Sequence, residues 1–322
     1  MKKLFILLVA CVLSCATAAN ATTWRINPSP FAKAQFKTVA EAMADINVSA
    51  GDTLLLDPGQ HEQCDVSARK NITVIGSGYF LDKNKQWSES QSTVLSSARI
   101  GSGSKIEGCD VTSSIILLGD ATASRCKVKE VVSSGENNLV TQCYCLSSIS
   151  LSNNSIVRNN MVFWRVSGSS GCIFENNIVV GSGYYSSGLT YIISDFRNST
   201  IRNNILINTN TGFDGNQVPK SCQIFEGCSN NVIQNNVFSV PEKYIDSSDM
   251  FKGYPNNHYV GATIENTFVN KGSDDAKWQI LDSSAAKGGA THGGDCGAFG
   301  GSTPYVLSGI PMFLPHITEA LV

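Results

Sequence analysis

The sequence is poor in charged residues, and this scarcity excludes several classes of protein. Only 16% of the 322 residues are charged, and removing Lys2 and Lys3 leaves 22 basic against 26 acidic residues. A nucleic-acid partner needs a clustered basic face, which this balance does not provide. Histidine is also scarce, and its four copies show no spacing typical of a metal site. We therefore expect no nucleic-acid partner, no metal and no cofactor.

Long hydrophobic runs are absent except at the N-terminus. Residues 4–13 are apolar, follow two lysines and precede small residues at 16–21, a pattern typical of a secretory signal peptide. The run is shorter than the about 20 residues that cross a bilayer, so we expect no transmembrane segment. We assign 1–21 to the signal and expect an exported protein, periplasmic, cell-surface or secreted. A lipobox-like stretch precedes Cys11, but a lipoprotein is disfavoured because cleavage there leaves a very short signal.

A short pattern recurs along the chain: an apolar residue, an outward polar residue, a turn residue, then Cys or Asn. Successive instances begin at Ile106, Ala123, Val140, Val157, Phe174, Ile201, Ile233 and Ile264. The first four intervals are each 17 residues, and the next three are 27, 32 and 31. Equal short intervals indicate a solenoid, in which each coil is too small to bury its own apolar face and shares a core with its neighbours. The predicted fold is all-β, a right-handed parallel β-helix.

The fourth position of the pattern predicts a ladder inside the solenoid. Its members are Cys109, Cys126, Cys143, Asn160, Asn177, Asn204, Asn236 and Thr267. Strands of neighbouring coils lie about 4.8 Å apart, so a buried Asn can bond the backbone at each bend and its stacked neighbours. We interpret the three cysteines as reduced thiols that fill the stack. A metal or disulfide role for them stays an alternative, and the nine cysteines after the signal cannot all pair within one chain.

The segment after the signal predicts a cap for the first coil. Thr38 and Glu41 fit a capping box, and Val39, Ala42, Met43 and Ile46 share one helical face. The next segment, Gly51-Asp-Thr to Pro58-Gly59, resembles the pectin-lyase-like superfamily, whose members often open with a short helix and such a strand and turn. This resemblance implies a right-handed parallel β-helix with a short N-terminal capping helix.

The C-terminal segment from Trp278 to Tyr305 is similar to the closing segment of uncharacterised bacterial surface β-helix repeat proteins. We accordingly assign 22–305 to the β-helix and 306–322 to a C-terminal tail. This architecture carries lyases, hydrolases, adhesins and inert scaffolds, so the resemblance implies a fold and not an activity.

The known catalytic motifs of the superfamily are missing from the sequence. There is no Trp-Ile-Asp-His strand or Arg-x-Pro-x-x-Arg segment of pectate lyases, and the one Asp-Asp pair, Asp274-Asp275, lacks the other polygalacturonase residues. Whether the chain is an enzyme is therefore left open. The outward second position places Arg158, Glu175 and Arg202 on neighbouring coils, where alternating charges predict a ladder of ion pairs.

The coils after the fifth are longer, and their extra residues must form loops, which commonly build the binding face of a solenoid. The candidate ligand-binding residues there are Tyr184, Tyr185, Asp195, Arg197 and Asp214. Aromatic faces beside a few charges suit sugar rings, and they also suit plain loop packing. We expect a non-catalytic exported scaffold that binds a polysaccharide. The alternative is a lyase or hydrolase that acts on an acidic polysaccharide.

Overall fold

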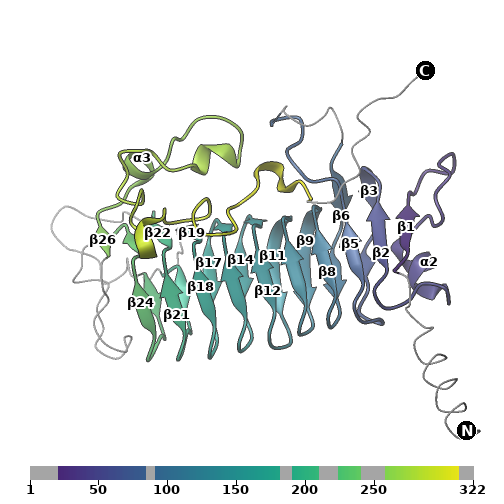
Figure 1. Ribbon diagram of the computed structural model, residues 1–322, viewed down its shortest axis with the longest axis horizontal. Coiled ribbons are helices and arrows are strands. Elements are labelled where there is room, and N and C mark those ends of the chain that lie inside the picture. Colours follow the sequence, from purple (N-terminus) through teal and green to yellow (C-terminus); the bar gives the residue numbers. More distant parts are fainter. Residues whose placement is uncertain (1–20, 85–90, 182–190, 210–223, 241–257, 312–322) are drawn as a thin grey trace, which may run out of the picture.

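The computed structural model describes residues 21–84, 91–181, 191–209, 224–240 and 258–311, and these form a right-handed parallel β-helix (Figure 1). One flank of the rod is a ten-stranded parallel sheet, here called sheet A. Its strands, in spatial order, are β1 (Thr23–Ile26), β2 (Thr53–Leu56), β5 (Thr73–Ile75), β8 (Lys105–Glu107), β10 (Thr122–Ser124), β12 (Leu139–Thr141), β15 (Ile156–Arg158), β18 (Ile173–Glu175), β21 (Thr200–Arg202) and β24 (Val232–Gln234).

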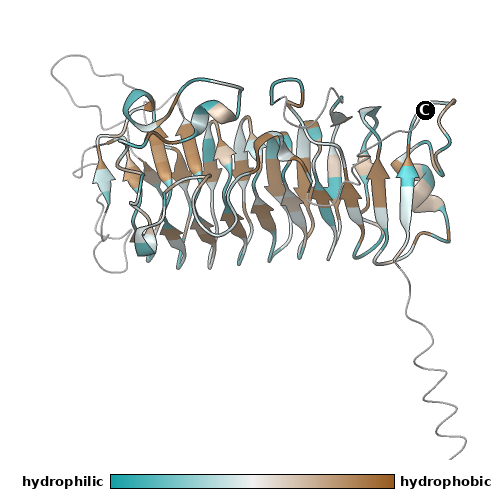
Figure 2. Cartoon of the chain, turned by 45° about the horizontal axis from the view of Figure 1, so that its top comes forward, coloured by the Kyte–Doolittle hydropathy of each residue, from teal (hydrophilic) through white to brown (hydrophobic). Residues whose placement is uncertain are grey.

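The remaining strands form a sixteen-stranded parallel network, here called sheet B, which wraps the other flanks of the rod. Its strands are β3 (Gly59–His61), β4 (Cys64–Asp65), β6 (Thr93–Leu95), β7 (Ala98–Ile100), β9 (Asp110–Leu117), β11 (Lys127–Ser133), β13 (Tyr144–Cys145), β14 (Ser148–Ser150), β16 (Met161–Val162), β17 (Arg165–Ser167), β19 (Ile178–Gly181), β20 (Ile193–Ser194), β22 (Ile205–Asn208), β23 (Phe225–Glu226), β25 (Val237–Phe238) and β26 (Tyr259–Val260). Figure 2 shows hydrophobic residues along the strands of both sheets. No helix within the described residues is long and apolar enough to cross a membrane.

The predicted register is confirmed from β8 to β24. Ile106 aligns with Ala123, Val140, Val157, Phe174, Ile201 and Ile233 along sheet A. From Gly108 to Asn235 the residue before each ladder position adopts a positive φ, between 50° and 68°, and turns the chain from sheet A into sheet B. Asparagine tolerates this left-handed conformation best among non-glycine residues, which explains its choice at four of these bends.

The predicted ladder of side chains lies inside the rod. Asn177 is fully buried, and its Nδ2 donates to the carbonyls of Val157 and Glu175, each at 3.0 Å, and to Oδ1 of Asn204 at 3.1 Å. In the cysteine rungs the thiol replaces the amide: Cys126 Sγ donates to the carbonyl of Ser124 at 3.2 Å. Thiol and amide therefore serve the same carbonyl, two residues back along the chain.

A second inward ladder, which the sequence pattern did not predict, lies at the opposite end of the sheet A strands. It consists of Ser104, Asn138, Ser155, Cys172, Ser199 and Asn231. Asn138 Oδ1 accepts from the amide of Ala121 at 3.1 Å, and Asn231 Oδ1 accepts from the amide of Ser199 at 2.9 Å. These residues precede the apolar position of each repeat by two, so the 17-residue period carries this ladder as well.

The helix α2 (Val39–Ala44) covers the first coil, as predicted. Thr38 Oγ1 accepts from the amide of Glu41 at 3.1 Å, but the Glu41 carboxylate accepts from Lys37 and not from the Thr38 amide, so the capping box is only half formed. Val39 and Ala42 are buried, whereas Ile46 is 91% exposed because the helix ends two residues earlier.

The last predicted repeat is wrong. Ile264 begins a helical turn, α3 (Ile264–Thr267), because Thr263 and Asn266 form a capping box in place of a strand. From here to Pro311 the chain no longer coils. It forms a strap, residues 262–311, with short 3-10 turns at Ala276–Trp278, Thr291–Gly293 and Leu307–Gly309, which runs back along the rod toward the N-terminal coils (Figure 1).

The strap covers an apolar outer face of sheet B. The first residues of β13, β16, β19, β22 and β25 point outward, and all five belong to a second hydrophobic cluster with strap residues such as Phe268, Ala290 and Tyr305. The fit is close: a Cβ on Gly297 would lie 2.6 Å from Cδ1 of Ile205. The fold therefore has two cores, one inside the solenoid and one beneath the strap.

The left-handed bend residues hold the strap by its backbone. Gln142 Nε2 donates to the carbonyls of Thr303 and Pro304, and Asn159 Nδ2 donates to Gly300 O at 2.7 Å. The same row continues with Arg125 on Ile310, Asn176 on Asp295, Asn203 on Thr291 and Asn235 on Gly289. One residue per coil thus forms the bend and binds the strap.

Candidate functional site

The outer face of sheet A carries two straight rows of side chains, one rung per strand. The first, here called the outer apolar row, is Leu139, Ile156 and Ile173, with Thr122 and Thr200 at its ends; all five are partly exposed. The second, here called the outer polar row, is Glu107, Ser124, Thr141, Arg158, Glu175, Arg202 and Gln234. Rungs in each row repeat at about 4.8 Å, the distance between paired strands. Together they make a flat amphipathic strip beside the strap.

The two halves of the outer polar row differ in burial. The sequence predicts that every rung faces solvent, but Glu107 is 4%, Ser124 4% and Thr141 8% exposed. Glu107 is covered because its carboxylate meets Lys105 Nζ at 2.5 Å and Arg125 Nη1 at 3.5 Å. From Arg158 onward the rungs are partly exposed. The open half is therefore the part of the strip that a large ligand can reach.

The predicted ion-pair ladder is formed on one side only. Arg202 Nη2 and Nε meet Glu175 Oε2 at 2.7 and 2.8 Å. Within the described residues Arg158 makes no ion pair, and its Nε is buried without a hydrogen-bond partner. The neighbouring Thr141 Oγ1 is also buried without a hydrogen-bond partner. Buried polar atoms normally have partners, so an unmatched hydroxyl and guanidinium on adjacent rungs mark this point as a candidate binding site.

The carboxylates of the row do not form a hydrolytic pair. Glu107 and Glu175 are four rungs apart, which corresponds to about 19 Å at the strand spacing. Glycoside hydrolysis requires two carboxyl groups roughly 5 to 9.5 Å apart on either side of the bond. The geometry of the row suits binding of an extended chain and not this chemistry.

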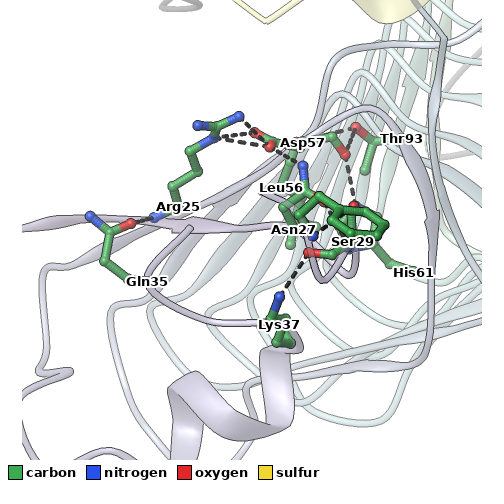
Figure 3. Close-up of polar contacts among 10 residues, drawn as sticks. Arg25, Asn27, Ser29, Gln35, Lys37, Leu56, Asp57, His61 and Thr93 are labelled. Atoms are coloured by element: carbon green, nitrogen blue, oxygen red, sulfur yellow. Dashed lines mark hydrogen bonds and ion pairs between the residues drawn. The ribbon is translucent and has the colours of Figure 1, made fainter. Parts of the chain in front are cut away.

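A second polar cluster lies at the N-terminal end of the rod (Figure 3). Asp57 accepts two hydrogen bonds from Arg25 Nε, at 2.8 and 2.9 Å, and another from Asn27. Burial alone raises the pKa of Asp57, but the hydrogen bonds and charge of Arg25 and the bond from Asn27 outweigh it and lower that pKa. His61 Nε2 donates to the carbonyl of Asp57 at 2.7 Å. These contacts tie the first coils together, so we interpret the cluster as structural.

Two of the five predicted ligand-binding residues lie within the described chain. Asp195 and Arg197 are both exposed and flank the fully buried Phe196 in the bend after β20. The structure contains no ion pair between them. Asp195 lies instead beside the next coil, where its backbone amide bonds the carbonyl of Glu226 at 3.0 Å. Tyr184, Tyr185 and Asp214 lie outside the described residues, so a site formed by all five stays a prediction.

The described cysteines form no disulfide and no three-residue metal cluster. All eight are buried, and burial raises the pKa of Cys64 and Cys145 to about 12. We expect that in the folded protein no thiol but Cys222, which lies outside the described residues, reacts with a thiol reagent within minutes. All nine thiols that follow the signal should react after denaturation without reductant. A lower count in the denatured protein would show that some of them are oxidised.

No protein-family model matches the chain, and no curated protein matches it. Among solved structures, the fold is similar to a pectin methylesterase mutant in complex with a hexasaccharide, at 14% identity and a TM-score of 0.37. That likeness covers 84% of this chain and 96% of the other. A likeness of this size carries no information on activity.

Proposed function

We propose that this chain is an exported, non-catalytic β-helix protein that binds an extended acidic polysaccharide along the outer face of sheet A. The observation that supports it is Arg158, which makes no ion pair within the described residues and has an Nε without a hydrogen-bond partner, beside the partly exposed aliphatic side chains of Leu139 and Ile156. Aliphatic side chains suit the apolar faces of sugar rings, and the free guanidinium suits a carboxylate.

The position of Arg158 makes the proposal testable by one substitution. Arg158→Gln should weaken binding of a uronate-containing polysaccharide about 10-fold or more, because a hydrogen bond to a charged group contributes roughly 1.5–3 kcal/mol. Binding should also fall as salt rises. Affinity electrophoresis in gels with and without the polysaccharide measures both effects.

Arg99→Gln is the matched control, since Arg99 pairs with Asp65 on sheet B and is partly exposed. It should leave binding unchanged. Equal retardation of the wild type, Arg158→Gln and Arg99→Gln would remove the proposed site. Release of unsaturated products from the same polysaccharides would show that the chain is a lyase. Release of new reducing ends would show that it is a hydrolase.

A further inference from the structure

The strap is attached to the rod in two different ways along its length. Its first part is anchored by apolar side chains, since Ala290, Cys296 and Ala298 are buried in the second core. Its end, residues 303–311, contributes one buried apolar side chain to that core, Tyr305, with Leu307 packed against it, and otherwise contacts the bends through backbone carbonyls. A segment that adds fewer apolar side chains to a core opens at lower free energy than one that adds many.

The end of the strap has one buried fastening. The hydroxyl groups of Tyr79 and Tyr305 lie 2.6 Å apart, and Tyr305 also donates to Asp275 Oδ2 at 3.3 Å. Asp275 is fully buried and accepts from the amide of Ser308 at 2.6 Å and from Asn84 Nδ2 at 3.0 Å. Within the described residues this carboxyl group has no ion pair, and its hydrogen bonds come from neutral donors.

The fastening also holds strained backbone. Phe80 and Ser308 both have a left-handed conformation, with φ of 51° and 61°, which is unfavourable for residues other than glycine. The two residues lock each other, because Ser308 Oγ donates to the carbonyl of Phe80 at 3.2 Å and the carbonyl of Ser308 accepts from Tyr79 at 2.8 Å. Such a conformation persists where surrounding contacts hold it, as the contacts between these two segments do.

The part of the outer polar row beside this segment is the buried part. Arg125 bridges the two, because its Nη1 bonds Ile310 O at 3.0 Å and lies 3.5 Å from Glu107. Gln142, the neighbour of Thr141 in sequence, bonds Thr303 and Pro304. The unmatched Thr141 hydroxyl thus stands next to the end of the strap, and a buried hydroxyl without a partner disfavours the closed arrangement.

We propose that residues 303–311 are a lid, fastened by Tyr79, Tyr305, Asp275 and Ser308, whose release uncovers Ser124 and Thr141 and lengthens the open half of the outer polar row. The anchored part of the strap stays in place during this opening. Only the identity of the ligand that binds the uncovered row depends on the proposed function. The opening itself requires no ligand.

A cysteine introduced at Thr141 tests the opening directly, because the described native thiols are buried and are expected to react only slowly with a thiol reagent. In a chain carrying Cys222→Ser, we expect Thr141→Cys to react with iodoacetamide faster than the core thiols do. Adding Tyr305→Phe, which removes the hydroxyl that joins Tyr79 to Asp275, should raise that rate about 10-fold. Gln234→Cys, in the open half of the row, should react at one rate with or without Tyr305→Phe.

Thr291→Val is the control within the anchored part, since it removes one hydrogen bond to Asn203. It should not change the reaction rate of Thr141→Cys. If Thr141→Cys reacts only as fast as the core thiols, and Tyr305→Phe does not alter this, the lid is refuted. Hydrogen exchange of the Tyr305 and Ser308 amides in the wild type gives an independent measure. Exchange as slow as that of the Ile178 amide would refute the lid equally, whatever the polysaccharide assays show.

Discussion

Replacing Asn177 by alanine is expected to lower the free energy of unfolding by about 4 kcal/mol or more, since each unsatisfied buried group costs about 1–3 kcal/mol. Besides the three bonds that its Nδ2 donates, Asn177 Oδ1 accepts from the amide and the Nδ2 of Asn160, each at 3.0 Å. Alanine removes all of these partners from a site that is fully closed to water. Thermal unfolding followed by circular dichroism should show a midpoint lower by roughly 10 °C.

Two further variants make this result specific to the ladder. Asn177→Cys should be milder than alanine, because the thiols of Cys126 and Cys143 already bond the carbonyl two residues back. Gln234→Ala, on the partly exposed outer row, should stay within about 0.5 kcal/mol of the wild type. A loss for Asn177→Ala no larger than for Gln234→Ala would contradict the ladder as a source of stability.

Removing the Asp52 carboxylate is expected to detach the first strand from the second. Asp52 is buried and accepts from the Thr22 amide at 2.8 Å, from Trp24 Nε1 at 2.8 Å and from the Ser49 amide at 2.9 Å. Asp52→Ala removes all three hydrogen bonds to a charged group, so we expect a loss of about 3 kcal/mol or more at pH 7. Denaturant unfolding monitored by tryptophan fluorescence measures it, because Trp24 is one of the donors.

The effect of Asp52 should depend on pH in a defined direction. Burial alone raises its pKa, but the bonds from Thr22, Trp24 and Ser49 outweigh this and lower the pKa below its usual value. A carboxylate with a lowered pKa stabilises the fold above its unfolded pKa, about 4, and loses that contribution as pH falls through the folded value. The gap in stability between the wild type and Asp52→Asn should therefore be largest near pH 7 and shrink below pH 4. A gap that is constant from pH 7 to pH 3 would contradict this assignment.

The solenoid could be predicted from sequence because one physical repeat governs it. Each coil needs an apolar residue at the inward position, which Val157 and Phe174 occupy in their coils. It also needs a residue that tolerates a left-handed bend, and a side chain that bonds the carbonyl two residues back. These requirements recur at every coil and leave a 17-residue period. The prediction failed at Ile264, where the same letters form a capped helical turn, because Thr263 supplies a cap that the pattern does not include.

The strap and the candidate site could not be predicted in the same way. The bend residues bind the strap through its backbone, so the identities of residues such as Gly300 and Pro304 follow no periodic pattern. A signal for it nevertheless existed: Met161 and Ile178 directly follow ladder residues, point outward and are apolar, so they required a cover. The burial of Glu107 depends on Arg125, a bend residue whose side chain turns toward it. The sequence period does not predict that contact.

The strap also imposes an order on the biosynthesis of this protein. Coils can stack one by one as the ribosome releases them, because each contacts mainly its neighbours. The apolar face of β16, β19 and β22 is then complete long before residues 286–311, which cover it, have been made. A nascent chain therefore exposes this apolar face until residues 286–311 have been made, and closing of the strap removes the exposed surface that chaperones and proteases recognise.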